Sequence, residues 1–138
     1  HTAAKPYLER FTYPWEALKG IKELLLKLGP TLGDDYEEVK PQVWVHKTAT
    51  VFPTAYLGAP CIIGPNTEVR HGAFIRGTAL VGADCVVENA VISGRCVLSG
   101  HAHVSGAILD KNVILGGNVR LSGHPSLPFF VEEGRVIN

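Results

Sequence analysis

The sequence predicts a mainly β protein, in which a parallel β-helix of six-residue repeats follows one amphipathic helix. A branched aliphatic residue recurs every six residues and keeps this spacing after each of two one-residue contractions. A small or β-branched residue stands two positions before each aliphatic residue. Asn, Asp or Gly stands three positions after several of them, and these residues tolerate the left-handed backbone of a tight corner. A fixed short period of this kind is typical of a solenoid.

Each repeat is predicted to be a short strand followed by a corner. Residues two apart on a strand point to the same side, so the small and the aliphatic residue of each repeat both face the core. Three repeats close a triangular coil of about 18 residues, which gives about four and a half coils. The aliphatic residues are Val45, Val51, Leu57, Ile63, Val69, Ile75, Val81, Val87, Ile92, Leu98, Val104, Leu109, Leu115 and Leu121. The expected corner residues are Asn66, Gly72, Asp84, Asn112 and Asn118.

The chain divides into three parts around this repeat. Residues 1–42 are expected to hold the amphipathic helix and an acidic connector, and residues 43–123 the β-helix. Residues 124–138 are expected to cap the last coil, because repeat arrays need atypical ends. Within this cap, residues 129–138 are predicted to form a terminal strand or a hairpin that turns at Glu133 and Gly134.

The helix is predicted over residues 15–28. Pro14 precedes it, and Gly29 and Pro30 end it. Apolar residues at spacings of three and four give it one apolar face, which must pack on something. This face consists of Leu18, Ile21, Leu25 and Leu28. The acidic connector follows over residues 31–42.

The residue just before each inward aliphatic residue points outward, and these residues form one column on each face of the triangle. The first column is Trp44, Ile62, Leu80, Val97 and Ile114. The second is Tyr56, Phe74, Val91 and Ile108, and the third is Thr50, Glu68, Val86, His103 and Arg120. Two columns are apolar and need cover. Either the helix covers one column and a partner subunit the other, or both columns face neighbours around a three-fold axis while the helix caps the first coil.

Composition excludes several classes of partner. Thirteen basic residues balance thirteen acidic residues, so no field of one sign attracts nucleic acid or an anionic membrane. We therefore expect neither nucleic acid nor a membrane as a partner. The longest apolar runs are too short to span a bilayer, and the start of the chain lacks the apolar segment of a signal peptide. We expect a cytoplasmic protein.

One segment concentrates residues that could carry chemistry. Residues 70–77 place Arg70, His71 and Arg76 within one coil. A guanidinium group can hold phosphate with two hydrogen bonds, and an imidazole can act as a general base. Arg70 and Arg76 are therefore candidates for binding substrate or phosphate, and His71 for catalysis. The alternative is a charged, solvated corner.

The three cysteines all occupy the inward small-residue position. They are Cys61, Cys85 and Cys96. Their spacing matches no metal-binding or redox motif, so we expect buried, free thiols.

Residues 60–77, which read PCIIGPNTEVRHGAFIRG, resemble the hexapeptide-repeat domain of sugar-nucleotide pyrophosphorylase-like proteins, and most closely the UDP-N-acetylglucosamine pyrophosphorylase-related group. YLERFTYPWEAL over residues 7–18 and VWVHKTA over residues 43–49 look like the helix and first coil of the same group. The resemblance covers residues 7–88 and implies a left-handed β-helix, commonly trimeric. ENAVI over residues 88–92 and AILDKNV over residues 107–113 look more like the β-helix of ADP-glucose pyrophosphorylases.

The resemblance supports three hypotheses about function. The first is a binding and oligomerisation module, which forms a homotrimer and takes a sugar phosphate or sugar nucleotide. The nucleotidyl-transfer domain of these families, with its Gly-rich loop, does not occur in the sequence, so the chain alone is not expected to turn over nucleotide. The second is an acyltransferase with His71 as general base and acetyl-CoA as the cofactor, held between subunits. The acetyltransferase stretches His-x-x-Tyr-[Val/Ile]-Gly-Asp-Ser and Gly-Ala-Gly-x-x-x-x-Asn are missing, however.

The third hypothesis is a metal-dependent enzyme of the carbonic anhydrase type. Hexapeptide-repeat carbonic anhydrases bind zinc with three histidines, and His71, His101 and His103 would be the candidates here. Their spacing matches neither that family nor a standard zinc motif. We therefore predict no metal site and no certain cofactor.

Overall fold

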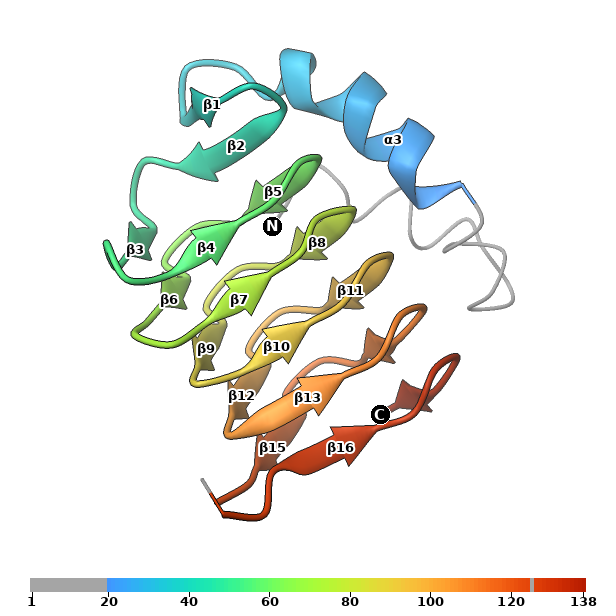
Figure 1. Ribbon diagram of the computed structural model, residues 1–138. Coiled ribbons are helices and arrows are strands. Elements are labelled where there is room, and N and C mark those ends of the chain that lie inside the picture. The colour runs from blue at the N-terminus through green and yellow to red at the C-terminus, as the bar shows by residue number, and fades with distance from the viewer. Residues whose placement is uncertain (1–19, 125) are drawn as a thin grey trace.

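The computed structural model describes residues 20–124 and 126–138. They form a stack of triangular coils with three mainly parallel sheets as its faces (Figure 1). The first sheet consists of β1 (Tyr36–Lys40), β2 (Val43–His46), β5 (Cys61–Ile63), β8 (Ala79–Val81), β11 (Cys96–Leu98), β14 (Ile114–Leu115) and β17 (Val136–Ile137). The second consists of β4 (Tyr56–Leu57), β7 (Phe74–Ile75), β10 (Val91–Ile92), β13 (Ala107–Leu109) and β16 (Phe129–Val131). The third consists of β3 (Thr50–Val51), β6 (Glu68–Val69), β9 (Val86–Glu88), β12 (His103–Ser105) and β15 (Arg120–Ser122).

This architecture confirms the predicted fold class. Five strands stack in each of the second and third sheets, so the chain makes about five coils. Viewed from the end that holds β2, the chain runs counter-clockwise as it advances away from the viewer, which is a left-handed path (Figure 1). The hand implied by the family resemblance is therefore present.

The predicted inward residues form the core. Of the fourteen aliphatic residues, thirteen are buried, and Val51 in the first coil is partly buried. The strands stack in register, so that like positions lie above one another from coil to coil. Ile63 pairs with Val81, which pairs with Leu98. Every coil therefore fills the same layer of the core with the same kind of side chain.

The predicted corner residues all adopt the left-handed conformation. Their φ angles are 58° for Asn66, 76° for Gly72, 58° for Asp84, 62° for Asn112 and 65° for Asn118. These residue types take such angles at low cost, which is why the sequence places them at corners.

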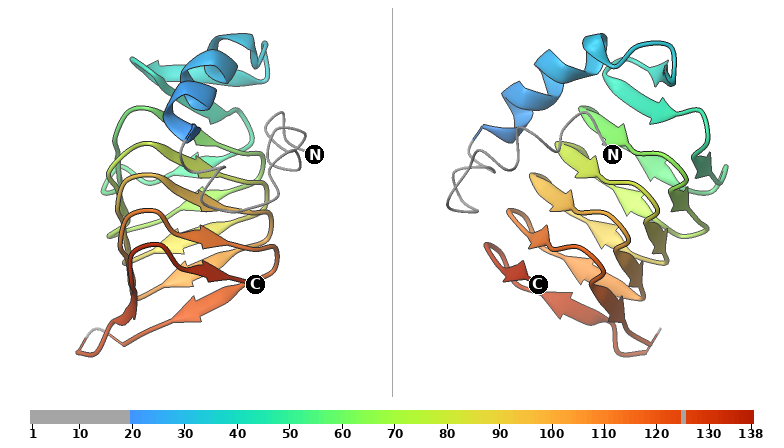
Figure 2. Two further views of the ribbon diagram at one scale, coloured as in Figure 1. Left: turned by 90° about the vertical axis from the view of Figure 1, so that its right-hand side faces the viewer. Right: turned by 180° about the vertical axis from the view of Figure 1, so that it is seen from behind.

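The amphipathic helix covers the first apolar column. Helix α3 (Ile21–Leu28) continues into a 3-10 turn, η1 (Gly29–Thr31), so the predicted end at residue 28 is confirmed. The predicted start at residue 15 and the apolar Leu18 lie outside the described residues. Ile21, Leu25 and Leu28 pack on Trp44, Ile62, Leu80 and Val97. Figure 2 shows α3 lying along the outside of the first sheet. The structure thus has the first of the two predicted arrangements of the helix, in which it covers a column rather than capping the first coil.

Both flanking segments contain more strand than the sequence indicated. The acidic connector predicted over residues 31–42 holds β1, which pairs antiparallel with β2 and extends the first sheet by one strand. Near the other end, β16 pairs with β13 and β17 with β14, both in parallel. The predicted turn at Glu133 and Gly134 is present, and Gly134 has a φ of 80°. Because Val131 pairs with Leu109 and Ile137 with Leu115, this segment continues the core pattern on two faces and does not form a hairpin.

A buried hydroxyl group joins two successive coils inside the core. Thr67 is fully buried, and its Oγ1 donates to the Gly82 carbonyl oxygen at 2.6 Å. The same oxygen accepts the backbone N–H of Cys85 at 3.1 Å. The hydroxyl group therefore satisfies one donor and one acceptor that the sheet hydrogen bonds leave unpaired.

Replacing this hydroxyl group tests its contribution. Thr67→Val keeps the shape of the side chain but leaves the Gly82 carbonyl and the Cys85 N–H without partners. We expect a loss of about 1–3 kcal/mol in the free energy of unfolding, measured by urea denaturation. Thr50→Val, at an exposed position of the third sheet, is the control and should change the stability by less than about 0.5 kcal/mol. Equal stability of the two variants would show that the hydroxyl group is dispensable.

Candidate functional site

The structure separates the three residues that the sequence nominated for chemistry. Arg70 and His71 lie on the corner between β6 and β7, whereas Arg76 lies on the next corner, between β7 and β8. Arg70 Nε donates to Glu68 Oε1 at 2.9 Å. His71 Nδ1 lies 3.0 Å from Thr54 Oγ1. Within residues 20–124 and 126–138, His71 has no hydrogen bond to a carboxylate that would orient it as a base.

Arg76 belongs to a cleft at the corner between the second and first sheets. The cleft has a volume of about 710 Å³. Four cationic side chains line it: Lys22, Arg76, Arg95 and Lys111. Two carboxylates, Glu23 and Asp110, also line it, so the lining carries a net charge of about +2. Only Arg76 of these residues was predicted from the sequence.

The missed residues could have been found from the register of the repeat. Arg76, Arg95 and Lys111 follow β7, β10 and β13 respectively, and these strands are consecutive in the second sheet. In-register stacking therefore places all three at one corner. Lys22 has no such signal, because the repeat does not specify where α3 lies.

The second apolar column lies on the surface of the molecule. Tyr56, Phe74, Val91 and Phe130 are each at least 36% exposed. They stack in register with Ile108 down the second sheet. The rings of Tyr56 and Phe74 are stacked with centroids 4.7 Å apart. Phe130 was not predicted as a member, because the sequence placed it in a terminal cap.

Comparison with known proteins assigns the family. The model of the GMPPB C-terminal domain matches residues 39–131, which is more than half of the chain. The chain belongs to the GMPPB C-terminal domain family. This family is a β-helix region of sugar-nucleotide pyrophosphorylases, so the predicted resemblance to these proteins is confirmed. The match also extends beyond residue 88, where the resemblance to the UDP-N-acetylglucosamine pyrophosphorylase-related group ends.

Two further comparisons add little to the GMPPB C-terminal domain match. The solved acetyltransferase domain of PglB from Neisseria gonorrhoeae FA1090 is similar to this chain at 19% identity, over 97% of this chain and 68% of that chain, with a TM-score of 0.35. A likeness of this extent carries no argument about function. No curated protein matches the chain.

The histidines of this GMPPB C-terminal domain are dispersed. His103 Nδ1 lies 3.0 Å from Arg120 Nη1 on the third sheet, and His101 Nε2 lies 3.7 Å from Asp84 Oδ2. In the described ranges 20–124 and 126–138, no three or more His, Cys, Asp or Glu side chains gather to hold a metal ion. In the same ranges, no helix has the length and apolar character needed to cross a membrane.

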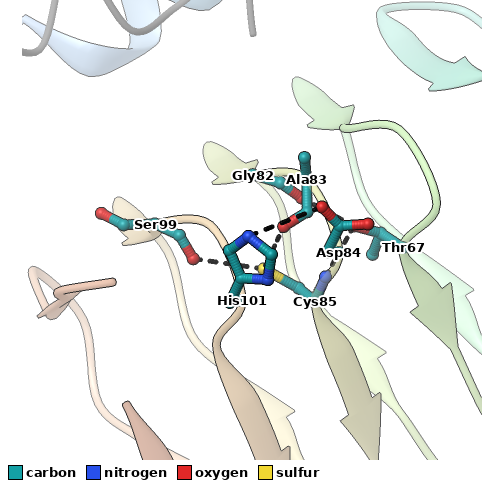
Figure 3. Close-up of polar contacts among 7 residues, drawn as sticks. All are labelled: Thr67, Gly82, Ala83, Asp84, Cys85, Ser99 and His101. Atoms are coloured by element: carbon teal, nitrogen blue, oxygen red, sulfur yellow. Dashed lines mark hydrogen bonds and ion pairs between the residues drawn. The ribbon is translucent and has the colours of Figure 1, made fainter. Parts of the chain in front are cut away.

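Cys85, His101 and Asp84 form the arrangement most like a nucleophile with a base (Figure 3). The thiol is unsuited to that role because it belongs to the core. Its Sγ donates to the Ser99 carbonyl at 3.2 Å and to the Ala83 carbonyl at 3.6 Å. Burial raises the pKa of Cys85, although hydrogen bonds from the backbone partly oppose this shift. A protonated, buried thiol is a poor nucleophile.

The other two thiols of the GMPPB C-terminal domain are also buried and free, as predicted. They stack on the first sheet with Ala79 between them. Burial raises the pKa of Cys61 to about 12 and that of Cys96 to about 11.

These shifts predict that the protein loses stability in alkali. The folded-state pKa values lie above the ordinary value of 9.0, so the contribution of the buried thiols to the free energy of unfolding is fully present below pH 9. Above pH 9 the unfolded chain releases their protons while the folded chain retains them, and the free energy of unfolding falls with rising pH. We expect the midpoint of thermal unfolding to decrease between pH 9 and pH 11. A Cys61→Ala, Cys96→Ala variant should show a smaller decrease, and an identical decrease would contradict the assignment to these thiols.

Proposed function

We propose that this chain is a binding and assembly module of a sugar-nucleotide transferase-like protein, and that it forms a homotrimer through its second sheet. The exposed apolar column of Tyr56, Phe74, Val91, Ile108 and Phe130 carries this proposal. A monomer rarely exposes a continuous apolar strip over five strands. The corresponding apolar column of the first sheet is buried beneath α3, whereas no described element covers the column of the second sheet.

The occupants that we propose are the second sheets of two further copies of this chain. The column contains no charged residue, and its side chains are spaced regularly because the strands stack in register. Three such columns can meet around a three-fold axis, so that each column contacts the same column of its two neighbours. The number three comes from the resemblance to β-helix proteins, which are commonly trimeric. The three free thiols accord with a reducing compartment, and we propose the cytoplasm.

The assembly is tested by placing charges in the column. Phe74→Lys with Ile108→Lys would bury two unpaired charges at the contact, so the trimer should dissociate into folded monomers. Multi-angle light scattering measures the mass, and circular dichroism reports whether the β-helix persists. Because α3 packs on the first sheet, its packing should not change.

Val86→Lys is the matched control, because Val86 occupies the same outward position on the third sheet. This variant should remain a trimer. If the unmodified chain is a monodisperse monomer, the assembly proposal fails, and the column must be covered by residues of its own subunit. If Val86→Lys also dissociates the trimer, the contact is not on the second sheet.

A further inference from the structure

The cleft at the corner between the second and first sheets is lined on one side by the coils and on the other by α3. Arg76, Arg95 and Lys111 come from three successive coils, which stack about 4.8 Å apart in a parallel sheet. Lys22 approaches from the first turn of α3. Cations therefore face the cleft from both sides, and Thr78 and Ser93 add hydroxyl groups to its lining.

The two carboxylates of the cleft offset only part of this positive charge. Asp110 Oδ1 accepts the backbone N–H of Lys111 at 2.8 Å, so one of its oxygens is occupied locally. Within residues 20–124 and 126–138, neither Asp110 nor Glu23 forms an ion pair with a cation of the cleft. The net charge of about +2 matches a dianion.

The backbone at this corner is unfavourable for the residues that line the cleft. Arg95 has a φ of 58° and Thr78 a φ of 49°, both in the left-handed region. The next coil has Asn112 at the same corner, and the last coil has Gly134, which are the residue types that this conformation favours. An arginine and a threonine therefore stand where the fold itself favours Asn or Gly. Such strain is found where a side chain serves function.

Gly94 on the cleft wall is a glycine that the fold does not require. A Cβ added there would meet only the Gly77 carbonyl oxygen, at 3.8 Å, which is an ordinary contact. The neighbouring Gly77 differs, since its φ is 123° and an added Cβ would lie 2.6 Å from the Ala59 carbonyl oxygen. Gly94 leaves its backbone open to a ligand in the cleft.

We infer that this cleft binds a small molecule through a dianionic phosphate or diphosphate group, such as that of a sugar phosphate or a nucleotide sugar. This inference rests on the binding role proposed above, and it assigns that role to the cleft. Guanidinium groups hold phosphate oxygens with paired hydrogen bonds, and Arg76 and Arg95 supply two such groups on adjacent coils. A volume of about 710 Å³ accommodates a ligand of nucleotide size.

Calorimetric titration of the full chain tests the inference, with glucose 1-phosphate, UDP-glucose, inorganic phosphate and glucose as probes. The three phosphate-bearing probes should bind, glucose should not, and affinity should fall as salt is raised, because the cations are exposed. Tighter binding of UDP-glucose would show that the cleft recognises more of a nucleotide sugar than one phosphate group, and equal affinities for all three would identify phosphate alone. Absence of binding by all three at about 10 mM would overturn the inference.

The decisive variant is Arg95→Asn, because it separates a structural role from a binding role. Asn suits the left-handed corner, so the midpoint of thermal unfolding should rise, whereas affinity for the bound probe should fall about tenfold or more. Gly94→Ala should weaken binding without unfolding the protein. Arg120→Gln is the matched control, since it removes an exposed guanidinium group from the third sheet, and it should leave affinity unchanged.

Two results on these variants would contradict the site. One is equal loss of affinity in Arg120→Gln and Arg95→Asn, which would indicate a nonspecific charge effect. The other is unchanged affinity in both Arg95→Asn and Arg76→Gln. Light scattering on the same samples keeps the two proposals distinct, because a trimer that does not bind phosphate refutes the cleft alone, and a monomer that binds phosphate refutes the assembly alone.

Discussion

The hydrogen bond between successive coils is the interaction on which the rest of this structure depends. Gly64 N donates to the Val81 carbonyl at 2.8 Å, and Gly82 N donates to the Leu98 carbonyl at 2.7 Å. Such bonds fix each coil directly above the next, so a side chain's position within its repeat determines which column it joins. A shift by one residue would move the whole aliphatic series from the core to the surface. The buried aliphatic columns and the hydrogen bonds therefore enforce the same register.

This register also organises the outside of the solenoid, where the three faces differ in chemistry and not in backbone. The first column is apolar and lies beneath α3, the second is apolar and exposed, and the third carries Glu68, His103 and Arg120. Stacking thus converts isolated residues, eighteen or so positions apart in sequence, into continuous surfaces. A single exposed apolar residue is common on a protein surface, but five in one column form a continuous apolar face, which proteins usually shield from water.

The fold was largely predictable because the sequence pattern that specifies it is periodic. The candidate site was not predictable, because it depends on single residues that follow no such pattern. Periodicity gave the strands, the buried cysteines and the corners at Asn66 and Asp84. It did not reveal β1, because Glu37 and Glu38 read as a solvated connector and the strand depends on pairing with β2. It also did not separate Arg70 from Arg76, which are close in sequence but lie on different corners. Arg95 was not predicted because arginine is not a residue type typical of a left-handed corner. Lys22 was not predicted because its position depends on how α3 packs on the first sheet.

The short strands bring the two proposed functions close together. On β7 the outward Phe74 belongs to the exposed column, the inward Ile75 belongs to the core, and Arg76 begins the corner that carries the cleft. Phe74 of the column and Arg76 of the cleft are therefore only two residues apart along the chain. A subunit that packs on the second sheet as proposed would end its contact at the edge of the cationic corner. None of the five side chains of the column carries a charge that would compete for a phosphate. The spacing of the repeat thus places the proposed assembly face and the proposed ligand-binding cleft on adjacent surfaces, and the two surfaces differ in chemistry.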